Sequence, residues 1–467
     1  MSDAEGIFDV VIIGAGFSGT MVAVHLARTA PGLRVLLADR EGAFGRGIAY
    51  GTGLFLHLLN VPAAKMSAFP DAPDNFVEWL DFHRPAFRSM GIEAMNPGDF
   101  VPRKIYGIYL RRLLDAARGS GTRMEILPAQ ISDIEPRDGL LHVTAESGKK
   151  FLARRAVLAL GNFPPCDPPV RDNSFHASPR YLSDPWSPET LQSISRNDDI
   201  LILGSGLTAL DLLVSLQSIK SRGIIHVISR HGLFPQVHRH HQARPMWFAD
   251  REFPTTIRAL LHQVRADVRR GATDGVDWRA IIDALRPHTQ RIWQSLPINE
   301  RRRFIRHLRA IWESHRHRAA PAVLAAKEAL LDRSQLLIHR GRVQSIADIN
   351  PGLQVTLFNR AMRRHHTIRV AYAVNCTGPE CNYQKLKSPL VVNLLARGLI
   401  DPDPLFLGLN ATSAGAVIDY LGNPSTEIFT LGSAAKGMLF ETTAVPELRV
   451  QAKNLAERLS NDLAHAG

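Results

Sequence analysis

The fold is decided by residues 9–19, which have the sequence Asp9-Val-Val-Ile-Ile-Gly14-Ala-Gly16-Phe-Ser-Gly19. The apolar run predicts a buried strand that ends at the glycines, and the residues after it have helical spacing. Gly14 permits a tight turn, Gly16 lets the backbone approach a pyrophosphate, and Gly19 lets the helix pack closely on the strand. The N-terminus of that helix offers free N–H groups and a positive dipole end to phosphates. The stretch therefore predicts a dinucleotide-binding unit.

An acidic residue follows at the position that such a site needs. A second apolar strand, residues 34–39, ends at Asp39, which lies 20 residues beyond Gly19. A carboxylate at this spacing accepts hydrogen bonds from an adenosine ribose. The predicted dinucleotide contacts of this first unit are Gly14, Ala15, Gly16, Phe17, Ser18, Gly19, Asp39 and Arg40, with Gly161 at the end of a later apolar run.

The pattern occurs a second time, which indicates an internal duplication. Residues 200–209 have the sequence Ile200-Leu-Ile-Leu-Gly204-Ser-Gly206-Leu-Thr-Ala209, and a helical pattern and another strand follow. Ser229 and then Arg230 stand where the acid would be, and a guanidinium in place of a carboxylate favours a 2′-phosphate. NADPH is therefore predicted in preference to NADH, although Arg230 could also be one surface arginine among many. The predicted contacts of this second unit are Gly204, Ser205, Gly206, Leu207, Thr208, Arg230 and Gly378.

Strands that alternate with helices predict an α/β fold with two Rossmann-like dinucleotide-binding domains. We expect the first domain to be split in the sequence, over residues 1–165 and 376–467, with the second domain inserted at 166–375. Residues 162–169 are rich in proline and indicate a hinge. Helical spacing over 245–330 predicts a helical insertion in the second domain, and residues 446–459 predict a terminal amphipathic helix.

The composition excludes several classes of protein. Of 467 residues, 45% are hydrophobic, which argues against disorder, and no apolar run approaches a membrane span. The net charge is +12, and residues 250–330 contribute +7 of it with 16 basic and 9 acidic residues. We interpret this basic stretch as a solvated face that could steer anions, and nucleic-acid binding is unlikely because acids interleave it. The acidic N-terminus does not resemble a signal peptide, so a cytoplasmic protein is expected.

The cysteines and histidines limit the chemistry. The three cysteines, Cys166, Cys376 and Cys381, form no C-x-x-C pair, which argues against a redox-disulfide mechanism. No spacing typical of metal ligands occurs, so no metal is expected. His238, His240 and His241 are interpreted as a solvated or phosphate-facing loop. A dinucleotide site with an acidic residue and a second site without one indicate two different dinucleotides. FAD in the first site and NADPH in the second would allow the nicotinamide to reduce the flavin.

Four further stretches resemble a known family. Residues 45–52, 59–67, 100–110 and 437–449 resemble bacterial flavoproteins that include FAD-dependent urate hydroxylase and L-aspartate N-monooxygenase. These families are more distantly related to ornithine and lysine N-hydroxylases. Two departures are Ser433, where many FAD enzymes have Asp, and Phe440, where Trp is common.

The resemblance implies roles for residues outside the glycine loops. Asn60 and Val61 would border the isoalloxazine ring, and Arg103 would approach the FAD. Gly432 and Ser433 would contact its ribityl-phosphate part. Thr442, Thr443 and Ala444 would begin the last helix with a threonine cap and present N–H groups to the flavin N1–C2=O edge, where a helix N-terminus stabilises negative charge. Asn60 and Lys65 are the candidate catalytic residues, and a purely structural loop is the alternative for both.

The leading hypothesis is an NADPH-driven FAD monooxygenase that acts on a small polar nitrogen-containing metabolite, such as a purine, amino acid or amine. NADPH would reduce the flavin, O2 would add at C4a, and the hydroperoxide would hydroxylate the substrate. The first alternative is an NADPH-dependent reductase that passes electrons to a partner or a quinone, and a basic RNA-binding flavoprotein has low weight. The sequence is compatible with a homo-oligomer and does not identify the substrate.

Overall fold

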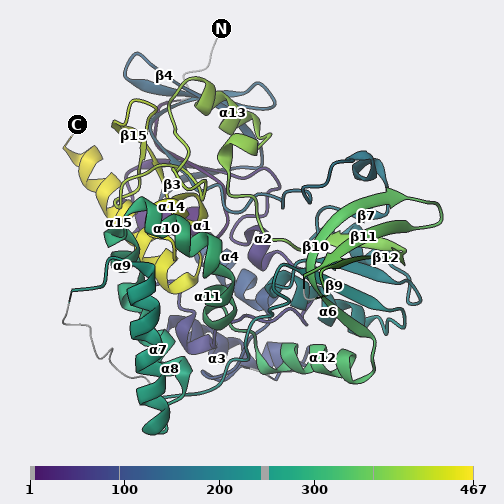
Figure 1. Cartoon of the computed structure of the whole chain (residues 1–467). Helices are drawn as coiled ribbons and strands as arrows, with labels where there is room; N and C mark the ends of the chain where they lie inside the picture. The colour runs from purple at the N-terminus through teal and green to yellow at the C-terminus, as the bar shows by residue number, and fades with distance from the viewer. Residues whose placement is uncertain (1–5, 94, 243–251, 361, 466–467) are drawn as a thin grey trace.

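The computed structural model describes residues 6–93, 95–242, 252–360 and 362–465, and these form two sheets that lie side by side (Figure 1). In the first sheet the strands have the order β14-β15-β6-β1-β2-β3, and the hairpin β4–β5 extends from β6. Strands β3, β2, β1, β6 and β15 are mutually parallel. The strands are β1 (Phe8–Ile13), β2 (Arg34–Ala38), β3 (Arg123–Leu127), β4 (Ile131–Arg137), β5 (Leu140–Ala145), β6 (Lys150–Leu158), β14 (Ala416–Ile418) and β15 (Pro424–Thr430).

The second sheet has the order β12-β11-β10-β9-β8-β13-β7. Strands β7, β13, β8, β9 and β10 are parallel to one another. Strands β10, β11 and β12 form an antiparallel meander. The strands are β7 (Tyr181–Leu182), β8 (Ile200–Leu203), β9 (Ile225–Ser229), β10 (Leu336–Asp348), β11 (Leu353–Asn359), β12 (Arg364–Val370) and β13 (Tyr372–Asn375). Two largely parallel sheets with helical crossovers confirm the predicted α/β class.

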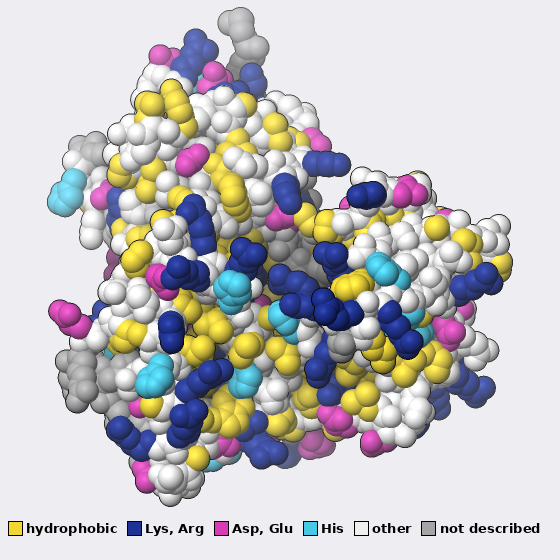
Figure 2. Space-filling view, in the orientation of Figure 1, with side chains coloured by type: hydrophobic (Ala, Val, Ile, Leu, Met, Phe, Trp, Pro, Cys, Tyr) yellow, Lys and Arg dark blue, Asp and Glu magenta, His cyan; other side chains and the backbone are white. Residues whose placement is uncertain are grey.

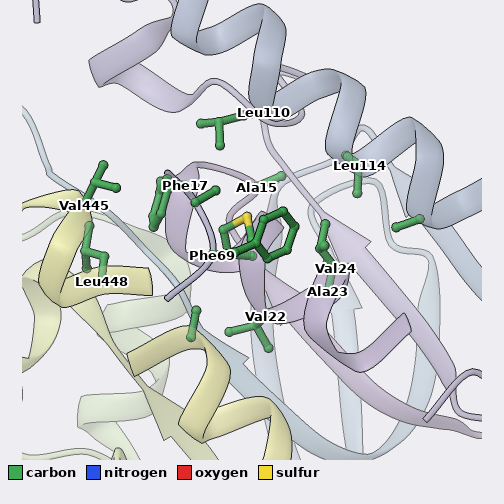
Figure 3. Packing of buried hydrophobic residues seen from close by; sticks show 14 of the residues in the cluster. Ala15, Phe17, Val22, Ala23, Val24, Phe69, Leu110, Leu114, Val445 and Leu448 are labelled. Carbon is green, nitrogen blue, oxygen red and sulfur yellow. The ribbon is translucent and has the colours of Figure 1, made fainter. Parts of the chain in front are cut away.

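Three helices bury one face of the first sheet: α1 (Phe17–Thr29), α4 (Arg103–Gly119) and α15 (Val445–Ala464). Figure 3 shows Val445 and Leu448 of α15 on one side of α1 and Leu110 and Leu114 of α4 on the other. Because residues from both ends of the chain share this core, the N-terminal glycine loop and the start of α15 are held close together. Helix α13 (Pro389–Ala396) packs on the opposite side, in the core that includes β4 and β5.

Helices α6 (Leu207–Ser218) and α12 (Pro321–Asp332) pack together on the second sheet. Outside the helical insertion, the other α-helices of the described residues are α2 (Gly47–Tyr50), α3 (Asn75–Arg88), α5 (Pro188–Ser193) and α14 (Lys436–Leu439). None of the helices in the described part of the chain combines the length and the apolar character that a membrane crossing requires.

The predicted insertion forms five helices: α7 (Ile257–Thr273), α8 (Trp278–Ala284), α9 (Thr289–Ser295), α10 (Ile298–His307) and α11 (Arg309–Arg316). These helices do not pack on the second sheet but lie on the side of the molecule that holds α15 (Figure 1). Trp293 stacks on Phe440 at 4.6 Å between ring centres, and its Nε1 donates to Gly437 O at 2.8 Å. The insertion therefore binds the C-terminal part of the first unit, although it belongs by sequence to the second.

The two glycine turns have the same backbone geometry. Gly14 has φ +101° and Gly204 has φ +100°, values that favour glycine. A Cβ at Gly14 would lie 2.2 Å from Ala159 O, and a Cβ at Gly204 would lie 2.4 Å from Cys376 O. In both units the first glycine is therefore required because the next parallel strand of the sheet ends against it. This confirms the tight turns expected from the internal duplication.

Candidate active site

The first glycine loop leaves open the space that a pyrophosphate needs. Gly16 caps α1 without any side-chain cap from the described residues, so the first N–H groups of the helix point outward. The nearest described atom to a Cβ built on Gly16, beyond its chain neighbours, is Gly47 Cα at 3.7 Å. Protein packing alone does not demand glycine here, whereas a closely approaching ligand does. Gly19 is different, because its Cβ would lie 1.9 Å from Gly14 O and would separate helix from strand.

Asp39 lies at the end of β2, as predicted, and its carboxylate already accepts backbone hydrogen bonds. Its Oδ2 accepts from Ala15 N at 3.0 Å, and its Oδ1 accepts from Glu41 N and Ala43 N at 3.1 and 3.2 Å. The carboxylate thus orders the glycine loop at the place where the ribose contact is expected. The neighbouring Arg40 is exposed and pairs with Glu41 at 3.0 Å.

Three segments predicted to contact the first dinucleotide meet at one turn. Gly432 has φ +73°, and its Cβ would lie 3.0 Å from Ser18 Oγ on α1. Thr442 donates to Gly432 O at 3.3 Å, while Gly432 N donates to Gln451 Oε1 at 3.2 Å. The turn after β15 therefore joins the start of α1 to the start of α15. Ser433 follows in the same turn, and Phe17 and Ala15 are buried beneath it.

The start of α15 differs from the prediction of a threonine cap. The N-cap is Ala444, in extended conformation and without a side-chain cap, and a proline occupies the first turn as expected. Thr442 cannot cap the helix because its hydroxyl is bound to Gly432 O and to Gln451. The exposed Thr443 and the half-buried Ala444 lie between this anchor and the helix. Pro446 has no N–H, and Glu447 N and Leu448 N donate to Ala444 O, so the N–H groups left for an anionic edge are those at and before Val445.

Beside these residues lies a small pocket of about 20 Å³, whose walls carry many charged groups. Its lining residues are Glu313, Arg316, His317, Lys436, Phe440, Glu441, Thr442, Thr443, Ala444 and Glu447. Burial raises the pKa of Glu441, and the nearby Arg316 opposes that shift. Burial also lowers the pKa of Lys436, and it lowers the pKa of His317 to about 4. The insertion and the C-terminal segment together therefore enclose a polar, poorly hydrated space.

One buried and one half-buried ion pair attach the insertion to the start of α15. Glu441 pairs with Arg316 at 3.0 Å and accepts from Trp312 Nε1 at 3.1 Å. Arg286 donates from Nε and Nη2 to the two oxygens of Glu447, at 2.5 and 2.8 Å. Breaking a buried pair on one side leaves an uncompensated charge, so these contacts hold the insertion in one position.

The second glycine loop is open in the same way as the first. No described atom outside its neighbours lies within 4 Å of a Cβ built on Gly206, which caps α6 without a side-chain cap. Ser205 Oγ donates to Leu233 O at 2.6 Å and lies 2.8 Å from Ser229 Oγ, so Ser229 orders this loop as Asp39 orders the first. Leu207 and Thr208 begin α6. Gly161 and Gly378 follow β6 and β13 with positive φ and open space around them.

Arg230 is exposed at the end of β9, and two arginines that sequence reasoning missed converge on it. Arg340 on β10 pairs in register with Ser229 on β9. Its side chain covers Gly232, because a Cβ built on Gly232 would lie 2.7 Å from Arg340 Cγ. Arg360 donates its backbone N–H to Arg340 O at 2.8 Å. Burial, and then the positive charges of Arg230 and Arg360, lower the pKa of His231. Arg230 and Arg360 directly follow β9 and β11, which is a signal in the sequence, whereas Arg340 lies within β10 and is brought here by strand pairing.

The loop of Asn60, Val61 and Lys65 faces the second unit. Asn60 and Val61 are half-buried, and Lys65 is exposed at the end of a short 3-10 turn. Phe100 beside this loop contacts His238, with 5.1 Å between ring centres. Burial, with Arg318 and Lys65 nearby, lowers the pKa of His238 to about 4.

The structure divides the histidine cluster. His240 is exposed, as expected for a solvated loop. The solvated alternative is wrong for His238, which is half-buried against Phe100, and for His241, whose Nε2 lies 3.0 Å from Asp283 Oδ2, while a phosphate-facing loop stays a prediction. The loop after β9 instead contacts the first unit through His238 and the insertion through His241.

Arg103 connects the two units. Its guanidinium, half-buried, donates to Leu58 O at 2.9 Å and pairs at 2.8 Å with the buried Asp211 of α6. His57 reinforces the contact through a 2.8 Å hydrogen bond with Ser215 of the same helix. The expected approach of Arg103 to the FAD stays a prediction, while its contacts place it at the junction between the sheets.

The described residues contain no group of three or more His, Cys, Asp or Glu that could hold a metal ion. The cysteines are all free, with Cys376 buried and Cys166 exposed.

The comparisons with known proteins agree with this architecture. Residues 11–163 match the model of a family described as FAD-NAD(P)-binding. No curated protein sequence matches the chain significantly. Among solved structures, L-lysine 6-monooxygenase from Pseudomonas syringae is similar with a TM-score of 0.68 and 17% identity, over 98% of this chain and 100% of that one.

Two further structures show the range of chemistry that this fold accommodates. The ornithine N-hydroxylase of Kutzneria sp. 744, with reduced FAD, NADP⁺ and L-ornithine, has a TM-score of 0.66 and 14% identity, over 98% and 99% of the chains. Bacillithiol disulfide reductase from Staphylococcus aureus has a TM-score of 0.57 and 13% identity, over 98% and 99%. These likenesses confirm the predicted fold, and function must come from the site.

Proposed function

We propose that the protein is an FAD-dependent, NADPH-driven monooxygenase that hydroxylates a small nitrogen-containing metabolite. One observation carries the proposal: a single chain holds two glycine turns that open onto uncapped helix N-termini, and the two differ in charge. The first is ordered by the carboxylate of Asp39, which suits an adenosine ribose. The second is bordered by arginines, which suit a 2′-phosphate.

The residues present fit both cofactors. Gly16 and Gly206 leave room that a Cβ would fill, and the N–H groups of α1 and α6 would bind the pyrophosphates. The start of α15, tied to Gly432 through Thr442, would direct its N–H groups and positive dipole end toward the pyrimidine edge of the flavin. Bound FAD would supply hydride acceptance from NADPH and activation of O2. Overall, NADPH, a proton, O2 and an N–H compound would give NADP⁺, water and the N–OH compound.

The insertion favours monooxygenation over simple electron transfer. It packs on the first unit through Trp293, the buried pair of Glu441 and the half-buried pair of Glu447, so one side of the expected flavin position is covered. A covered site excludes water and protects a reactive oxygen species from unproductive loss. The structural likeness to lysine and ornithine hydroxylases supports this chemistry, and the resemblance to urate and aspartate hydroxylases adds purines and amino acids to the candidate substrates.

The test is a coupled assay on the FAD-loaded protein. NADPH oxidation, O2 consumption and peroxide release are measured with L-lysine, L-ornithine, L-aspartate, cadaverine and urate, and products are identified by mass. We expect one compound to accelerate NADPH oxidation and to suppress the release of peroxide. The mass of that compound should rise by about 16 units, because hydroxylation adds one oxygen atom. Rapid NADPH oxidation with a quinone acceptor and no hydroxylated product from any compound would favour the reductase.

A further inference from the structure

Helix α6, which begins at the second glycine loop, carries a buried polar stripe. Asp211 and Ser215 stand four residues apart and are 4% and 1% exposed. Residues at this spacing lie on the same face of a helix. Burying a carboxylate is costly unless it is paired, so this stripe needs polar partners from another part of the molecule.

Arg103 of the first unit pairs with the first residue of this stripe. Its Nη1 lies 2.8 Å from Asp211 Oδ2, and its Nη2 donates to Asp211 Oδ1 at 3.3 Å. Burial raises the pKa of Asp211 and the charge of Arg103 opposes that rise, so the guanidinium favours the charged form of the carboxylate. The Nε of Arg103 donates to Leu58 O at 2.9 Å, which ties the same guanidinium to the loop before Asn60.

His57 of the first unit binds the second residue of the stripe, and the direction of each hydrogen bond follows from the donors present. The hydroxyl of Ser215 donates to Asp211 O at 3.0 Å, so it must accept from His57 Nε2, which is 2.8 Å away. The other ring nitrogen, Nδ1, then accepts from Thr52 Oγ1 at 2.8 Å. A neutral His57 with its proton on Nε2 therefore joins the first unit to α6.

We call these contacts the junction clasp: His57 and Arg103 of the first unit with Trp186, Asp211 and Ser215 of the second. The ring centre of Trp186 lies 6.0 Å from that of His57 and 5.8 Å from Arg103 Cζ. On the face shown in Figure 2 the two units form separate lobes with a notch between them, so their relative position depends on contacts across the junction. The insertion also crosses to the first unit, but the clasp acts directly on α6, whose N-terminus would hold a pyrophosphate of NADPH.

We propose that the junction clasp positions α6 relative to the first unit, so that bound NADPH meets the flavin at the distance that hydride transfer requires. This inference rests on the proposed function. NADPH would give one hydride, which is a proton with two electrons, to the oxidised flavin and become NADP⁺. Asp211 and Ser215 are positioning residues, because they act through the position of α6 and not on either cofactor.

The test is anaerobic mixing of the FAD-loaded protein with NADPH while the absorbance of the oxidised flavin is recorded. The limiting rate at saturating NADPH reports on hydride transfer, and the half-saturating concentration reports on binding. We expect Asp211→Asn to lower the limiting rate about tenfold or more, because misplacing reacting groups by about 1 Å can cost about 10²-fold. The half-saturating concentration should change by less than about twofold, because the glycine loop is untouched.

Two further variants and a control assign the effect. Asp211→Glu, which keeps the charge, should recover part of the rate, and Ser215→Ala, which removes the hydrogen bond to His57, should lower the rate by less than Asp211→Asn. Asp267→Asn is the matched control, because Asp267 is also a buried carboxylate on a helix, 1% exposed, but accepts from Gln263 within the insertion. FAD content and melting temperature report on folding, and Ser215→Ala decides the question if Asp211→Asn does not fold.

Hydrogen exchange in the apoprotein gives a readout that needs no cofactor. In Asp211→Asn the backbone amides of residues 52–58 and of α6 should exchange faster, whereas those of β1 should not change. An unchanged limiting rate, whether or not exchange rises at the junction, would overturn the inference, because the clasp would then be structural only. A loss confined to the half-saturating concentration would also overturn it, since Asp211 would then act on NADPH binding.

Three outcomes separate this inference from the proposed function. Flavin reduction that slows in the variants, with no hydroxylated product from the wild type, would refute the monooxygenase and leave the clasp established. Hydroxylated product from the wild type, with reduction unchanged in Asp211→Asn, would refute the clasp alone. A wild-type flavin that NADPH does not reduce would refute both.

Discussion

Replacing Arg230 with alanine tests the proposed NADPH site. The arginine is exposed and shares the end of β9 with Arg340 and Arg360, so a bound 2′-phosphate would keep two guanidinium partners after the substitution. A charge-assisted hydrogen bond contributes about 1.5–3 kcal/mol, and the exposure of Arg230 places it at the lower end of that range. A loss of about 1.5 kcal/mol corresponds to slightly more than a tenfold change in an equilibrium constant.

The assay is steady-state kcat/KM of the FAD-loaded protein with NADPH and with NADH. We expect Arg230→Ala to lower kcat/KM about tenfold for NADPH and to change the NADH value by less than about twofold, because NADH has no phosphate for the arginine to bind. Arg230→Ala combined with Arg360→Ala should lose more. Arg222→Ala is the matched control, since Arg222 is also exposed but precedes β9 at its opposite end. Equal losses with both nucleotides would refute the assignment of this cluster to the 2′-phosphate.

Three further predictions concern cofactor binding, stability and pH. Gly16→Val should abolish FAD binding while the chain stays folded, because the space at Gly16 is open in the protein and needed by the pyrophosphate; a yellow variant with full FAD content would contradict this. Trp293→Ala should lower the free energy of unfolding by about 3–5 kcal/mol in urea, because the buried indole fills the contact between insertion and Phe440, whereas Trp293→Phe should lose much less. Burial, and then the charge of Arg103, lower the pKa of His57 from 6.5 to about 4. The unfolded chain therefore takes up this proton first, and the free energy of unfolding should fall as the pH drops from 6.5 toward 4. His57→Gln should make that fall shallower in urea titrations at several pH values, and an unchanged pH dependence would show that His57 is not responsible.

The glycine turns were predictable from the sequence because their geometry is local. The positive φ of Gly14 and Gly204 is a local requirement, whereas the strand ends that approach them, at Ala159 and Cys376, come from far along the chain. Asp39 was predictable for the same reason, since the rest of helix α1, a short turn and strand β2 separate it from Gly19. The fold class followed from repeating such a unit twice in one chain.

The threonine cap could not be predicted correctly because a distant contact outweighed local preference. Thr442 has the residue type that favours an N-cap, but its hydroxyl is bound to Gly432 and Gln451, and Ala444 caps the helix instead. Arg103 is similar, since its pairing with Asp211 crosses between the two units and spans 108 positions of the chain.

The sequence alone determined the class of fold, the two glycine turns and the acid that distinguishes the first from the second, because each depends on backbone geometry within about 30 residues. Only the tertiary structure decided that Arg340 and Arg360 join Arg230, that the insertion binds the start of α15, and that Asp211 and Ser215 of α6 meet Arg103 and His57. Those meetings depend on the order of strands in a sheet and on which apolar face a helix buries, and neither is encoded in the spacing of residues along the chain.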